Sequence, residues 1–197
     1  MNALLTLSRR IDALTEWIGK SAIWVVLIVV LISAGNAVMR HAFSISSNAW
    51  LEIQWYLFGL IFLSCSGYAL LHNEHVRIDL LSNKLSKRGR AWIDIFGILF
   101  FLLPMAVMIL TLSWPVFAQA FESGEMSNSP GGLIVWPARL MIPAGFALLI
   151  LQSASELVKR IGFLKGLCPD PTEKRAKSAG EKIAESIQAQ ETREEKP

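Results

Sequence analysis

Long uncharged apolar stretches alternate with short polar segments along most of this chain. Residues 21–39, 53–71 and 95–121 carry no charged side chain, and residues 134–158 carry only Arg139 and Glu156. A helix needs about 20 predominantly apolar residues to cross the hydrocarbon core of a bilayer. The pattern therefore predicts an all-α integral membrane protein with four transmembrane helices. Their expected bounds are about 21–40, 51–72, 92–119 and 134–159, which together form a transmembrane domain over residues 21–165.

The third stretch is longer than the hydrocarbon core requires and contains Pro104 and Pro115. We expect it to tilt or to break, because a proline within a helix removes a backbone donor and displaces the preceding turn.

The segments at the two termini are richer in charged residues than the four long apolar stretches. Apolar residues recur at helical spacing over residues 1–20, with Arg9, Arg10, Asp12 and Glu16 between them, which predicts an amphipathic helix lying in the membrane interface. The alternative is a frayed, partly solvated terminus. Residues 166–197 are rich in charge and poor in large apolar side chains, so we expect a disordered or weakly helical tail.

The distribution of basic residues predicts the orientation. With four spans, both termini and the segment between spans two and three share one side, and that side holds 17 of the 19 Lys and Arg residues. Arg40 and Arg139 lie on the other side. The positive-inside rule then places both termini in the cytoplasm.

Composition narrows the function classes. Hydrophobic residues make up 53% of the chain, charged residues only 18%, and the mean hydropathy is +0.43, which disfavours a soluble enzyme. The net charge of +3 is too small and scattered to indicate nucleic-acid binding. The two cysteines, Cys65 and Cys168, provide neither a disulfide framework nor a metal site. We expect no catalytic, cofactor-binding or metal-binding residues.

The three histidines do not suggest haem ligation. His72 and His75 lie three residues apart on one segment, and His41 lies at the opposite membrane face, so no two of them can hold one iron from opposite sides. No nucleophile pattern or glycine-rich phosphate loop is present either.

Polar residues mark the ends of the first two spans. Asn36 and Arg40 lie four apart on one helix face, and Glu52 opens the second span across a short loop. Arg40 and Glu52 can neutralise one another, or each can extend separately into the headgroups. Arg139 and Glu156 are too far apart to pair, so each marks a membrane edge or a partner chain.

Small residues lie in both spans, Gly67 among them, and serve either internal packing or contact with another membrane protein. All seven tryptophans, including Trp50 and Trp136, fall near predicted membrane edges, as interfacial anchors do.

These features, in this order, resemble the small membrane subunit (the Q subunit, DctQ-like) of TRAP transporters, the tripartite ATP-independent periplasmic carriers. The resemblance covers about residues 10–165. It rests on the sequences NAVMRHAF and NAWLEIQWYLFGLIF, the small residues ending at Gly67, the segment His75-Val76-Arg77-Ile78-Asp79-Leu80, and the run from GEMSNSPGG onward. Many relatives open the second span with two adjacent acids, whereas this chain has Leu51-Glu52.

The resemblance implies a non-enzymatic subunit of the bacterial inner membrane. Its partners would be a large membrane subunit that holds the sodium and solute sites and a periplasmic solute-binding protein that delivers a carboxylate-type solute. Within the His75 segment, His75, Arg77 and Asp79 are expected to anchor the cytoplasmic end of span two, with a proton relay as the alternative. A membrane anchor of a redox complex and a stand-alone small carrier remain rival interpretations.

Overall fold

The computed structural model describes residues 2–45, 47–72 and 86–168, and its regular elements are helices. Four helical runs in this part of the chain are long and apolar enough to cross a membrane, which confirms the predicted fold class. The elements are α1 (Asn2–Phe43), α2 (Asn48–His72), α4 (Lys87–Gly97), the π-helical turn η1 (Ile98–Leu102), α5 (Leu103–Ser123) and α6 (Trp136–Leu164).

Helix α1 differs from the expectation for the amino terminus. The amphipathic segment predicted over residues 1–20 is not a separate element, because one helix of 42 residues continues through it into the first span. At about 1.5 Å per residue this helix is about 63 Å long, roughly twice the thickness of the hydrocarbon core. No proline or helix-terminating glycine conformation interrupts it, since Gly19 and Gly35 both lie within regular helix.

The third span is one run of 37 residues built from α4, η1 and α5. Ser86 caps its start by accepting a hydrogen bond from the backbone N–H of Gly89 at 3.2 Å. The predicted irregularity occurs as the widened turn η1, which precedes Pro104. A π-helical turn gives space to a proline ring that would otherwise collide with the carbonyl four residues earlier. Pro115 lies inside α5 without ending it.

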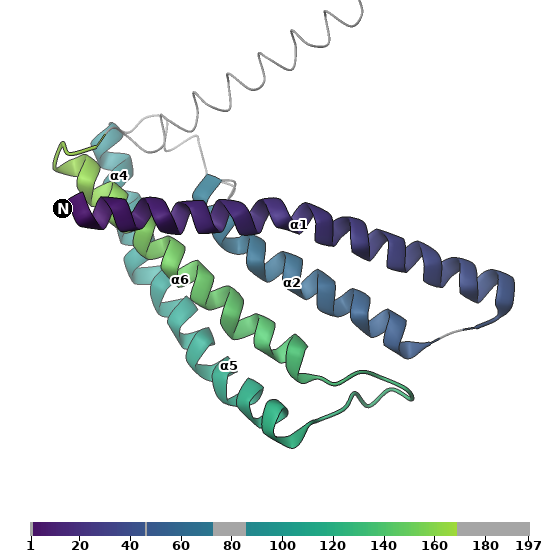
Figure 1. Ribbon diagram of the computed structural model, residues 1–197. Coiled ribbons are helices and arrows are strands. Elements are labelled where there is room, and N and C mark those ends of the chain that lie inside the picture. Colours follow the sequence, from purple (N-terminus) through teal and green to yellow (C-terminus); the bar gives the residue numbers. More distant parts are fainter. Residues whose placement is uncertain (1, 46, 73–85, 169–197) are drawn as a thin grey trace, which may run out of the picture.

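The helices form two antiparallel hairpins, α1–α2 and α5–α6 (Figure 1). They converge at the end that holds the start of α1 and the end of α6, called here the terminal end, and spread apart toward the segments joining α1 to α2 and α5 to α6, called here the loop end. Helix α6 is central because it contacts α1, α2, α4, η1 and α5.

Close backbone approach joins the two hairpins midway along α2 and α6. A Cβ at Gly145 would lie 2.6 Å from Cβ of Leu63 and 3.1 Å from its carbonyl oxygen, so α6 needs glycine here. Leu70, Ala106 and Leu149 form a small buried apolar cluster nearby. Most other large apolar side chains on the helices are exposed, as expected for surfaces that face lipid or another membrane protein.

Candidate functional site

Polar side chains buried between α1 and α6 form the most extensive interaction site at the terminal end. Thr15 donates to Oε1 of Gln152 at 2.8 Å, and the hydroxyls of Ser8 and Ser155 lie 2.7 Å apart. Gln152 and Ser155 both donate to Oδ1 of Asp12, at 2.9 and 2.8 Å. We call this set the α1–α6 polar cluster; its members are Ser8, Asp12, Thr15, Gln152, Ser155, Glu156 and Lys159.

Lys159 is the charged centre of this cluster. Its Nζ lies 2.8 Å from Oδ2 of Asp12 and 2.6 Å from Oε1 of Glu156. The side chains of Glu156 and Lys159 are only 3% and 14% exposed. One ammonium group therefore bridges two carboxylates on different helices, and each carboxylate loses its counter-ion if Lys159 is removed.

A second ion pair lies one residue further along α6. Nη1 of Arg160 is 2.7 Å from Oδ2 of Asp94, and the two side chains are 3% and 14% exposed. This pair fixes the start of the third span to α6. Adjacent residues Lys159 and Arg160 thus tie α6 to two different helices at the same level of the bundle.

Helix α2 joins the terminal end through small residues and a histidine. Buried Gly67 lies against Thr15 and Gln152, and a Cβ at Gly19 would overlap the Tyr68 ring. His72 Nε2 is 2.7 Å from Oε2 of Glu16. Of the two uses considered for the small residues, the neighbours of Gly67 correspond to packing within the chain.

Glu52 anchors the α5–α6 loop at the loop end. Ser127 donates its hydroxyl to Oε1 of Glu52, and the backbone N–H of Leu133 donates to Oε2 at 2.7 Å. Asn48 of the same helix donates to the carbonyl of Pro130 at 3.0 Å. These three hydrogen bonds therefore join the start of α2 to the loop over residues 124–135.

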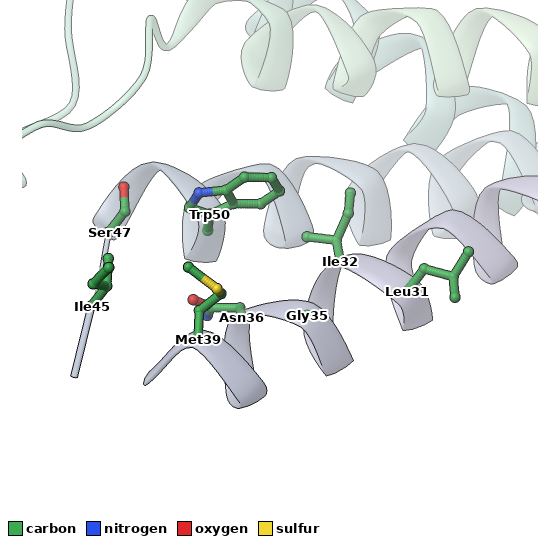
Figure 2. Close-up of a pocket in the computed structure, with 8 residues that line it drawn as sticks. All are labelled: Leu31, Ile32, Gly35, Asn36, Met39, Ile45, Ser47 and Trp50. Carbon is green, nitrogen blue, oxygen red and sulfur yellow. The ribbon is translucent and has the colours of Figure 1, made fainter. Parts of the chain in front are cut away.

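The possible Arg40–Glu52 bridge is not present. Both carboxylate oxygens of Glu52 are engaged by the α5–α6 loop, and no ion pair joins Arg40 to any residue in the described part of the chain. The alternative, in which both side chains extend separately, agrees with the exposed Arg40 side chain and is wrong for Glu52, which binds the α5–α6 loop. Asn36 and Trp50 line an apolar pocket between α1 and α2 (Figure 2).

Trp136 and Arg139 stabilise the start of α6. The Trp136 ring meets Phe121 edge-on, with centroids 5.4 Å apart, and Nη1 of Arg139 pairs with Oε2 of Glu125 at 2.7 Å. Arg139 therefore has a partner within the chain. Glu156, expected at a membrane edge or on a partner chain, instead lies buried in the α1–α6 polar cluster.

His75, Arg77 and Asp79 lie outside the described residues, as do residues 169–197 of the predicted tail. His41 and His72 lie at opposite ends of the α1–α2 hairpin, which agrees with the geometric argument against a shared iron. No group of three or more potential metal ligands occurs within residues 2–45, 47–72 and 86–168.

Sequence reasoning missed the α1–α6 polar cluster, although a signal was present. Ser8, Asp12 and Thr15 follow one another at spacings of four and three, and the four cluster residues of α6 repeat the same stripe. The amphipathic pattern over residues 1–20 predicts Asp12 among the polar positions of an interfacial helix, whereas in the structure it contacts α6. Two matching polar stripes on apolar helices indicate a buried polar contact between them.

Comparison with known families places this geometry in context. A family described as tripartite ATP-independent periplasmic transporters, DctQ component, matches residues 28–162, well over half of the chain. No curated protein and no solved structure matches the chain significantly.

Proposed function

Because this chain belongs to the DctQ component family of the tripartite ATP-independent periplasmic transporters, we propose that it scaffolds the large membrane subunit of such a transporter. The transported solute is of the carboxylate type, uptake is coupled to sodium, and a periplasmic binding protein delivers the solute. DctQ is a transporter component family and not an enzyme family.

The main support for the proposal is that the buried charged side chains pair with one another within this chain. The charged side chains of Asp12, Asp94, Glu156, Lys159 and Arg160 bind one another and hold helices together. Carriers that move ions usually place polar groups and interrupted helices near the bilayer midplane. Here the internal charges stabilise a fixed bundle, which suits a support for a moving partner.

The exposed apolar surface of the helices is the second argument for a scaffold function. Large side chains such as Phe62 of α2 and Phe101 of η1 are 79% and 67% exposed. The small apolar core leaves wide helix faces that the large subunit or lipid must cover. Contacts by Asn36, Trp50, His75, Arg77 and Asp79 with partner subunits or headgroups belong to this proposal.

Orientation follows from the positive-inside rule. The terminal end faces the cytoplasm of a bacterial inner membrane, and the loop end faces the periplasm. The loop over residues 124–135 carries only acidic charge before Arg139 and is fixed by Glu52. It offers an ordered surface to the solute-binding protein.

Co-purification tests the proposal. The affinity-tagged full chain, expressed together with its large membrane subunit, should retain that subunit through detergent purification and raise the thermal unfolding midpoint of the large subunit. A large subunit that purifies alone with an unchanged midpoint would contradict the scaffold function.

A further inference from the structure

A pocket of about 370 Å³ opens between α1 and α2 near the loop end. Figure 2 shows Met39, Asn36, Gly35 and Leu31 along α1, with Trp50 of α2 opposite and Ile45 and Ser47 near one end. The lining is almost wholly apolar. Its volume lies in the range of about 300–1,000 Å³ that is typical of small-molecule sites.

The depth of the pocket follows from the charge-free stretch of α1. Residues 21–39 span about 28 Å of helix, close to the thickness of the hydrocarbon core. The pocket residues of α1, Leu31 to Met39, therefore lie in the half of the bilayer nearer the loop end. Arg40 follows directly at the level of the headgroups.

A cationic residue in the adjacent pocket indicates the occupant. Arg40 and His41 line a second, more polar pocket of about 450 Å³ that shares Asn36 with the first. Arg40 is exposed, and Glu52 is engaged elsewhere. An apolar pocket at acyl-chain depth beside a cationic group at headgroup depth complements a molecule with an apolar chain and an anionic head.

We propose that the loop end of the α1–α2 hairpin binds a phospholipid, with one acyl chain in the pocket between Leu31 and Trp50 and the phosphate at Arg40. A membrane lipid fits better than a helix of another protein because a cationic side chain lies close to this apolar pocket at the level of the headgroups. An anion at the adjacent headgroup level also satisfies Arg40. The proposal is independent of the transport function.

Gly35 gives a sharp test because no atom lies within 4 Å of where its Cβ would be. The Cβ of Gly35→Leu therefore enters open space, its side chain takes up room in the pocket, and leucine favours helix over glycine. Ala34→Leu adds the same side chain to the exposed neighbouring position outside the pocket. Both variants place a leucine on α1, but only Gly35→Leu places it in the pocket.

The experiment uses the full chain in nanodiscs containing phosphatidylglycerol with a photoactivatable diazirine on its acyl chain. Cross-linked peptides are quantified by mass spectrometry. Labelling should concentrate on the segments Leu31–Met39 and Ile45–Trp50, fall severalfold in Gly35→Leu, and stay unchanged in Ala34→Leu. Arg40→Gln should lower the preference for phosphatidylglycerol over phosphatidylcholine about fivefold, as expected for one basic residue near a lipid surface.

Three results would overturn the proposal. Labelling could be spread over all lipid-exposed helix surfaces instead of the two segments. Gly35→Leu and Ala34→Leu could also show the same amount of labelling. With the large subunit present, cross-links from these segments could run to that protein instead of to lipid, which would assign the pocket to a protein contact.

Discussion

Lys159 Nζ lies 2.8 Å from Oδ2 of Asp12, which joins α6 to α1 across 147 positions of sequence. The same ammonium group also neutralises Glu156. If Lys159 is replaced by an uncharged residue, the carboxylates of Asp12 and Glu156 both lose their counter-ion inside the bundle. This bridge joins the part of α1 at the terminal end to α6.

The first prediction concerns this bridge. Lys159→Met should lower the free energy of unfolding in detergent by about 3 kcal/mol, because it leaves Asp12 and the buried Glu156 without a counter-ion. Asp12→Leu should cost less, since Lys159 keeps Glu156. The triple variant Asp12→Leu, Glu156→Leu, Lys159→Met should recover most of the loss.

Chemical denaturation followed by circular dichroism measures these differences. Glu122→Gln, at an exposed position, is the matched control and should change little. Equal losses for Asp12→Leu and Lys159→Met would show that Glu156 does not depend on Lys159.

The second prediction concerns Glu52. Glu52→Leu should speed amide hydrogen exchange at Leu133, because it removes the carboxylate oxygen that accepts the hydrogen bond of this N–H. Arg40→Gln should leave the exchange of this loop unchanged, since Arg40 does not contact Glu52. Faster amide exchange of the loop in both variants would contradict this and would indicate that Arg40 and Glu52 interact.

The third prediction compares two glycines. Gly145→Ala should destabilise the bundle by about 1–3 kcal/mol because its methyl group meets Leu63 and the α2 backbone. Gly35→Ala should stabilise α1 by about 0.5–1 kcal/mol, because the space there is open and alanine favours helix. Thermal unfolding midpoints in one detergent test both, and a fall in both midpoints would mean that Gly35 is packed against something.

The fourth prediction concerns orientation. In a chain whose two native cysteines are replaced by serine, a cysteine at the exposed Asn128 should react with an impermeant thiol reagent added outside intact spheroplasts. A cysteine at the exposed Lys165 should react only after lysis. The reverse labelling would invert the proposed topology.

The sequence alone predicts the number and type of spans because charge is costly in hydrocarbon, so uncharged stretches such as residues 21–39 are unambiguous. It does not predict where α1 begins. Leu4, Leu7 and Leu14 are typical of an interfacial helix, whereas contact between Asp12 and Lys159 depends on how α1 crosses α6, which is set by packing. Glu52 illustrates the same limit, because its partners Ser127 and Leu133 lie far along the chain.

Uptake by reconstituted proteoliposomes tests the scaffold account most directly. Under an inward sodium gradient and with the solute-binding protein present, the large subunit together with this chain should accumulate the carboxylate solute. Each membrane subunit alone should not, and Lys159→Met should lower the rate in proportion to the amount of assembled complex. Sodium-driven uptake by this chain alone, or full uptake by the large subunit without it, would contradict the account.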